Sequence, residues 1–185
     1  MKKIVIFLAI ATLAIAQVNL VFLGGIGVTK GSDVLNDQLF RISLSSGANY
    51  GLKAQAMAGR IGVEVYYTLN TLESNAIDKV TNGKLDFSDK FANYGIGLVL
   101  QGGGILNPYL SFDYGKTRFL GSHKYATDGK HYSLGLGVKF APAFFGVWGE
   151  ARILRVSDLL KEFSEFKTEG KFTTFSVTVG GLIKF

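Results

Sequence analysis

Alternation of apolar and polar residues with a period of two recurs along most of this chain. In "RIGVEVYYTLN", residues 60–70, nearly every second residue is apolar, and "HYSLGLGVKF", residues 131–140, repeats the pattern. Successive side chains of a β-strand point to opposite faces, so this period predicts strands with one apolar and one polar face. A single strand of this kind suits a soluble sheet as well as a membrane protein, so the number and spacing of the strands must separate the two.

The pattern occurs in eight stretches, which are residues 18–29, 50–57, 60–70, 94–101, 108–115, 131–140, 144–155 and 172–185. Their connections alternate between short ones, at 58–60, 102–107 and 141–143, and long ones, at 30–47, 70–89, 116–130 and 156–171. Transmembrane β-barrels have short periplasmic turns and longer extracellular loops, whereas a soluble sandwich has no reason to sort its loops in this way. The sequence therefore predicts an all-β fold: an eight-stranded, antiparallel, up-and-down transmembrane β-barrel with both chain ends on the periplasmic side.

Charged residues inside the predicted strands fall on the face that carries Gly, Ser, Thr and Gln. A charge on the lipid face near the membrane centre costs about 2 to 4 kcal/mol, so this face is predicted to point into the barrel lumen. Because an unpaired buried charge is costly, the mixed signs predict an ion-pair network. The predicted lumenal polar network comprises Lys53, Arg60, Glu64, Asp113, Lys139, Glu150 and Arg152, and Lys184 lies on the same face.

The first residues, "MKKIVIFLAI ATLAIAQ", combine two lysines, an apolar run and a small-x-small ending. These features predict a cleaved secretory signal peptide at residues 1–16, followed by a barrel domain at residues 17–185. The apolar run from residue 4 to 16 is shorter than the roughly 20 residues of a membrane-spanning helix. The chain has no cysteine, which excludes thiol catalysis and cysteine-ligated zinc.

The closing stretch "FTTFSVTVGGLIKF" places Phe175, Val177, Val179, Ile183 and Phe185 on one apolar face. Together with the signal peptide, the eight strands and "NPYLSFDYG", this ending resembles the small outer-membrane β-barrel proteins of the OmpX-like and OmpA-transmembrane-domain-like group, over residues 17–185. The resemblance implies a bacterial outer-membrane location and a structural, envelope-stabilising or surface-interaction role. It also implies that these five residues act as the assembly signal read by the outer-membrane insertion machinery.

Two other classes of function stay open in the sequence. Lumenal glycines such as Gly25 and Gly97 leave room for a narrow conduit for a small solute or ion, although an eight-stranded barrel is just wide enough for side chains to fill. His131, Ser133 and Asp113 occupy odd positions on adjacent strands, which permits a Ser-His-Asp group and a lipid-A-modifying enzyme. Because His131 lies near the loop rim and Asp113 nearer mid-strand, no catalytic residue is assigned and a non-enzymatic protein is expected.

No cofactor, metal or nucleic-acid site is predicted. His123 has no second histidine or carboxylate at ligand spacing. The glycine-rich stretches "GGIGVTKG" and "QGGGIL" do not open a helix after a parallel strand, as a phosphate-binding loop does. The net charge of +6 includes two lysines of the signal peptide, and no basic stripe interleaves with aromatic residues.

Continuing the alternation past the strand ends predicts an outward-facing cationic rim at the long-loop end. This rim consists of Lys116, Arg118, Lys130 and Arg155, on three successive strands. Long cationic side chains at an interface can reach the phosphates of lipopolysaccharide, so a lipid-phosphate site is predicted there. Loop 156–171 fits either a short amphipathic helix or an extended hairpin, which would serve as a binding tip or simply pack on its neighbours. A monomer is expected.

Overall fold

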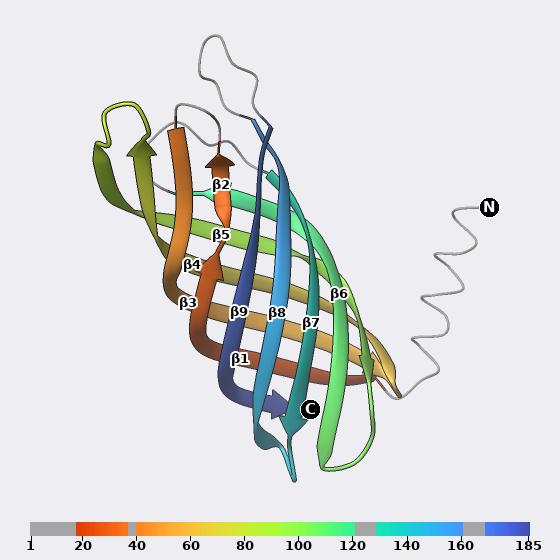
Figure 1. Ribbon diagram of the computed structural model, residues 1–185. Helices are drawn as coiled ribbons and strands as arrows, with labels where there is room; N and C mark the ends of the chain where they lie inside the picture. Colours follow the sequence, from red (N-terminus) through yellow and green to blue (C-terminus); the bar gives the residue numbers. More distant parts are fainter. Residues whose placement is uncertain (1–17, 37–39, 121–128, 161–168) are drawn as a thin grey trace, which may run out of the picture.

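The computed structural model describes residues 18–36, 40–120, 129–160 and 169–185, which form a barrel of long tilted strands (Figure 1). The strands are β1 (Val18–Gly31), β2 (Asp33–Asn36), β3 (Phe40–Ala58), β4 (Ile61–Asp78), β5 (Lys84–Gln101), β6 (Leu106–Phe119), β7 (Gly129–Phe140), β8 (Phe145–Leu160) and β9 (Glu169–Lys184). Among these residues there is no helix that is both long enough and apolar enough to cross a membrane. The predicted signal peptide, residues 1–16, lies outside the described residues.

Pairing of the first and last strands closes the sheet. Successive strands pair antiparallel in chain order, and β1 pairs with both β3 and β9. The short strand β2 follows β1 after Ser32 and pairs with β3 in the same direction, so β1 and β2 form one wall of the barrel. The described residues therefore confirm the predicted eight-stranded, up-and-down, antiparallel β-barrel.

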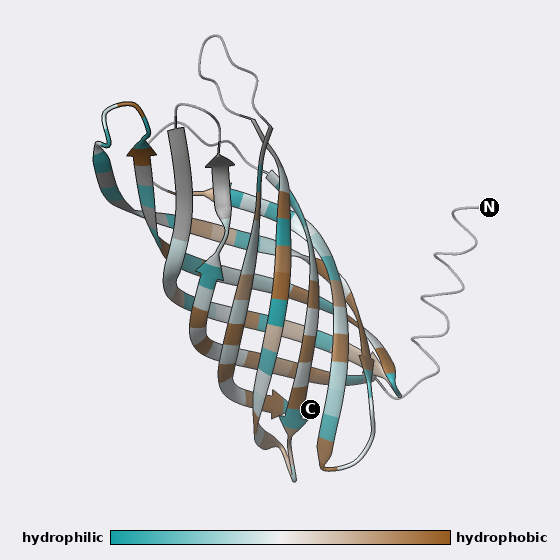
Figure 2. Ribbon diagram, in the orientation of Figure 1, coloured by the Kyte–Doolittle hydropathy of each residue, from teal (hydrophilic) through white to brown (hydrophobic). Residues whose placement is uncertain are grey.

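The barrel is apolar outside and polar inside. Along β7, side chains alternate regularly between buried and exposed, and the exposed ones include Leu134, Leu136 and Val138. The buried ones on the same strand include His131, Ser133 and Lys139. Figure 2 shows apolar and polar residues following one another along most of the long strands. The apolar face of the period-two pattern thus points outward and the polar face inward, which is the reverse of a soluble protein. An apolar solvent around the barrel requires this arrangement.

The two ends of the barrel differ. One end, here called the turn end, carries the connections 59–60, 102–105 and 141–144. Val18 pairs with Ala58 at this end, and the Phe185 amide donates to the Leu20 carbonyl oxygen at 2.8 Å, so the described chain begins and finishes there. The opposite end, here called the loop end, carries the remaining connections.

Strands at the loop end are longer than the sequence predicts. The predicted connection 70–89 is mostly strand, because β4 runs to Asp78, β5 begins at Lys84 and only residues 79–83 form the turn. The predicted connection 30–47 likewise contains β2 and the first part of β3. Above the apolar band both faces of a hairpin meet water, so no alternation is enforced and the period-two signal fades. The predicted loop 156–171 is also partly strand, because β8 continues to Leu160 and β9 begins at Glu169. Residues 161–168 lie outside the described part.

Candidate functional site

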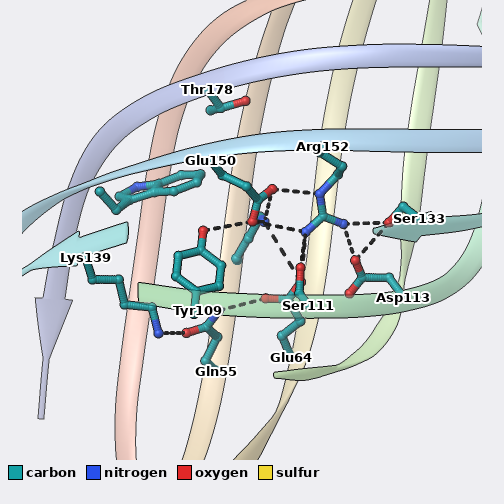
Figure 3. A network of polar contacts seen from close by, with 12 residues as sticks. Gln55, Glu64, Tyr109, Ser111, Asp113, Ser133, Lys139, Glu150, Arg152 and Thr178 are labelled. Atoms are coloured by element: carbon teal, nitrogen blue, oxygen red, sulfur yellow. Dashed lines mark hydrogen bonds and ion pairs between the residues drawn. The ribbon is translucent and has the colours of Figure 1, made fainter. Parts of the chain in front are cut away.

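The middle of the lumen holds an ion-pair network centred on Arg152 of β8 (Figure 3). Its Nε donates to Glu150 Oε1 at 2.7 Å and its Nη2 to Glu64 Oε1 at 3.1 Å. Its Nη1 donates to Asp113 Oδ2 and, at 2.7 Å, to Ser133 Oγ. One guanidinium thus joins carboxylates from β4, β6 and β8.

A second cation, Lys53 of β3, extends this network. Lys53 Nζ of β3 donates to both carboxylate oxygens of Glu150, at 2.6 and 2.7 Å, and lies 3.9 Å from Glu64 Oε1. The Tyr109 hydroxyl also donates to Glu150 Oε2 at 2.8 Å. All five charged residues of the cluster are almost fully buried, and each has charged partners, as buried ions require.

Two residues of the predicted network behave differently. Lys139 Nζ donates to the amide oxygens of Gln55, at 2.5 Å, and Gln101, at 3.1 Å, and Gln55 in turn donates to Glu64. Lys139 therefore joins the network through Gln55. Arg60 does not join it: the residue is exposed in the 59–60 turn, so its assignment to the lumen is wrong. The alternation in "RIGVEV" extends to Arg60, but the strand begins at Ile61.

Hydroxyl and amide side chains form a layer between this network and the loop end. Thr117 Oγ1 donates to Asn93 Oδ1 at 2.7 Å, so it accepts from Nδ1 of His131 at 2.9 Å. The other ring nitrogen of His131, Nε2, then accepts from the Tyr66 hydroxyl. This layer was missed in the sequence, although each member sits at an inward position of the alternation.

The three residues considered for a Ser-His-Asp group are divided between these two layers. Ser133 Oγ donates to Asp113 Oδ2 at 2.8 Å, within the ion-pair network. His131 is bonded to Tyr66 and Thr117 instead, and it is fully buried. In this arrangement His131 neither receives a proton from Ser133 nor is oriented by Asp113.

Apolar clusters close the lumen on both sides of the polar layers. The turn-end cluster consists of Val21, Leu23, Met57, Val99, Tyr109, Trp148 and Leu182. The loop-end cluster consists of Leu72, Phe91, Leu154, Val156 and Phe172, with Phe119 packed against it. The cavity between the ion-pair network and the loop-end cluster measures about 20 Å³, which is room for about one water molecule.

Inward-facing glycines make room for this filling. A Cβ added to Gly97 would collide with the carboxylate of Asp113, and one added to Gly137 would lie 2.5 Å from the Tyr109 ring. One added to Gly135 would lie 2.5 Å from Ser111 Oγ. These lumenal glycines accommodate neighbouring side chains and are not evidence of an open path.

The outer surface carries a belt of tyrosines toward the loop end. Tyr50, Tyr67, Tyr94, Tyr114 and Tyr132 are exposed, one on each strand from β3 to β7. Tyr67 pairs with Tyr94, and the rings of Tyr114 and Tyr132 are 5.2 Å apart. Tyrosine rings prefer the boundary between membrane and water, so this belt marks one edge of the apolar band.

The predicted cationic rim lies beside the tyrosine belt. Lys116, Arg118, Lys130 and Arg155 are all exposed. Lys116 pairs with Lys130 across β6 and β7, and Tyr132 pairs with Arg155 across β7 and β8. These four cations therefore occupy one side of the barrel, next to the membrane boundary that the tyrosines mark.

The predicted assembly-signal residues all face outward, four of them on β9 and Phe185 directly after it. Phe175, Val177, Val179, Ile183 and Phe185 are exposed. The Phe185 ring packs edge-on against Phe22 of β1, with centroids 6.1 Å apart. Within the described residues, His, Asp and Glu side chains form no group of three that would suit a metal ion.

No model of a known protein family matches the sequence, and no curated protein matches it. The structure is similar to that of Neisserial surface protein A, with a TM-score of 0.65 and 14% identity over 90% of this chain and 97% of that one. It is also similar to Ail, the attachment invasion locus protein of Yersinia pestis, in complex with the heparin analogue sucrose octasulfate. That TM-score is 0.51, with 13% identity over 92% of this chain and 100% of Ail. At such identities the likeness concerns architecture, and the chain has the fold of the small eight-stranded outer-membrane β-barrel proteins.

Proposed function

We propose that this protein is a bacterial outer-membrane β-barrel that acts as a structural or surface-interaction protein, and neither as a pore nor as an enzyme. The observation that carries this proposal is the filled lumen. The network around Arg152 and the two apolar clusters occupy successive levels of the barrel. A solute crossing the barrel would have to displace all three levels.

The two ends of the barrel support an orientation. Short turns are typical of the periplasmic side of such barrels, so the turn end, with both ends of the described chain, is assigned to the periplasm. The longer strands of the loop end then rise from the outer face of the membrane. This part of the protein is the one that a surface partner would meet.

The cationic rim supports an interaction with lipid phosphate. Lys116, Arg118, Lys130 and Arg155 are exposed beside the tyrosine belt, and at this edge of the apolar band we expect the phosphates of lipopolysaccharide. Arginine binds phosphate through two parallel hydrogen bonds, and long stems allow the charged heads to leave the apolar layer. Ail, a structural neighbour, is in complex with the polyanion sucrose octasulfate, which is a precedent for anion binding on this fold.

Conductance measurements test the closed lumen. The refolded protein is inserted into a planar bilayer, with a large porin as the positive control. We expect no discrete channel openings over the voltage range in which the porin conducts. Regular single-channel steps would favour the alternative of a narrow conduit.

An assay of lipid A acylation tests the enzymatic alternative, and no change in acylation is expected.

Co-purification tests the lipid-phosphate site. The double variant Arg118→Ala/Arg155→Ala should retain less bound lipopolysaccharide than the wild type while remaining folded. The control Lys79→Ala/Lys84→Ala removes the same charge at the 79–83 turn and its border, away from the rim. Equal lipid content in the rim variant and the wild type would contradict the proposed site. Light scattering of the protein in detergent tests the expected monomer.

A further inference from the structure

A second cavity lies at the turn end of the lumen and measures about 60 Å³. Its polar lining comes from Asn19, Gln101, Asn107, Lys139 and Lys184, and none of the residues that line it is acidic. About 15 Å³ of such volume holds one water-sized group, so the cavity has room for about four. It is distinct from the mid-lumen cavity beside Arg152, which has a different lining.

The cavity is positively charged. The Lys139 ammonium is buried, and its two hydrogen bonds go to the neutral amide oxygens of Gln55 and Gln101. Among the described residues, hydrogen bonds connect Lys139 to a carboxylate through Gln55, which donates to Glu64 Oε2 at 2.7 Å. Lys184, an exposed residue, also lines this cavity and adds a second positive charge beside it. A buried ammonium without a direct counter-ion is costly, so an anion in this cavity would stabilise Lys139.

One of the residues that line the cavity, Asn107, has a side-chain acceptor that lacks a donor. Asn107 pairs with Lys139 across β6 and β7, and both residues line the cavity. The Oδ1 atom of Asn107 is buried and has no hydrogen-bond partner among the described residues. A buried acceptor without a donor is unfavourable, and a hydrogen bond from a ligand hydroxyl group would remove that cost.

We propose that this cavity binds a hydrogen phosphate ion. The ion has four oxygens, which matches the space available. Its anionic oxygens would accept hydrogen bonds from the Lys139 and Lys184 ammonium groups, and its P–OH group would donate to Asn107 Oδ1. This assignment follows from the charge, the size and the unpaired acceptor of the cavity, and it does not depend on the proposed surface role.

Titration with inorganic phosphate tests the proposal. The ¹⁵N-labelled protein is refolded in detergent micelles and titrated at constant ionic strength, while the side-chain amide signals of Gln101 and Asn107 are followed. We expect these signals to shift and to saturate with phosphate. Sulfate at the same concentration lacks a hydroxyl at neutral pH and should bind at least several-fold more weakly. Absence of a saturable shift, or equally tight binding of sulfate, would overturn the proposal.

Three variants locate the site. Asn107→Asp keeps the side-chain size and places a carboxylate beside Lys139, so phosphate affinity should fall by more than about 10-fold. Lys184→Gln should weaken binding by about 10-fold, because one charge-assisted hydrogen bond is lost. Lys84→Gln removes the same charge at the start of β5, at the opposite end, and should leave the affinity unchanged. Wild-type affinity in Asn107→Asp, or an equal loss in Lys84→Gln, would refute the site, and heat-modifiability on gels checks that each variant is folded.

Discussion

Lys53 on β3 and Glu150 on β8 meet inside the barrel, with Nζ 2.6 Å from Oε2, although β1 and β9 lie between their strands in the sheet. Replacing Lys53 with Met leaves Glu150 with the Arg152 guanidinium and the Tyr109 hydroxyl alone. Because breaking a buried ion pair leaves an uncompensated charge, we expect a loss of about 3 kcal/mol in the free energy of unfolding. Urea unfolding in lipid vesicles, followed by Trp148 fluorescence, measures this loss. The control Lys116→Met removes an exposed cation and should change stability little.

Glu64 provides an independent test of the same network. Its carboxylate accepts from Gln55 Nε2 at 2.7 Å and from Arg152 Nη2 at 3.1 Å, and it is almost fully buried. We expect Glu64→Ala to destabilise the barrel by about 1 to 3 kcal/mol more than Glu73→Ala, an exposed position on the same strand. Equal urea midpoints for the two variants would mean that the network contributes nothing to stability.

Two adjacent glycines of β9 should differ in how well they tolerate replacement by alanine. A Cβ on Gly180 would collide with the carbonyl oxygen of Gly24, whereas one on Gly181 would meet its nearest neighbour, the Gly146 carbonyl oxygen, at 4.0 Å. Gly180→Ala should therefore destabilise the barrel by about 1 to 3 kcal/mol, as overpacking does. Gly181→Ala should be nearly neutral. The folded fraction on unheated gels measures the difference, and the prediction fails if both variants fold equally well.

Phe185 is expected to support assembly, because the last strand must pair with the first to close the barrel. Its amide donates to the Leu20 carbonyl oxygen at 2.8 Å, and its ring packs on Phe22. Deleting Phe185 should lower the heat-modifiable, membrane-inserted population in cells. Phe144→Ala, at an exposed turn residue, serves as the control. Unchanged assembly after the deletion would remove this residue from the proposed signal read by the insertion machinery.

Asp78, at the loop end of β4, provides a pH-dependent probe of the 79–83 turn. Hydrogen bonds from the Thr81 hydroxyl and the Val80 amide hold the pKa of Asp78 below its ordinary value of 3.8. A lowered pKa means that the contribution to turn stability is present above about pH 4 and is lost as the pH falls through the lowered pKa. The Val80 amide signal should titrate with that pKa. In Asp78→Asn, the same signal should stay constant over this range.

Much of this architecture is predictable because lipid enforces alternation. The period of two identified every strand that crosses the apolar band, and it placed Lys53, Glu64 and Arg152 on one face. It did not reveal the strand extensions above the band, where β4 continues to Asp78 between two hydrated faces. It also assigned Arg60 to the lumen, because alternation alone does not show where a strand ends.

Inward positions were predictable, but partners were not. Alternation states which way a residue points, whereas the pairing of His131 with Tyr66 and Thr117 depends on the register and on the stagger around the barrel. The same holds for the cavity at the turn end. Asn107 and Lys139 are 32 residues apart in sequence and become neighbours only through the pairing of β6 with β7.

The charged members of the network around Arg152 come from β3, β4, β6 and β8, so no single hairpin contains it. A partly assembled sheet would expose these charges to lipid without their partners, at a cost of several kcal/mol for each. Intermediates that insert before closure are therefore penalised, and insertion, closure and neutralisation of the interior become a single cooperative event. The polar interior thus favours completion of the barrel, because only the closed barrel gives every one of these buried charges its partner inside the membrane.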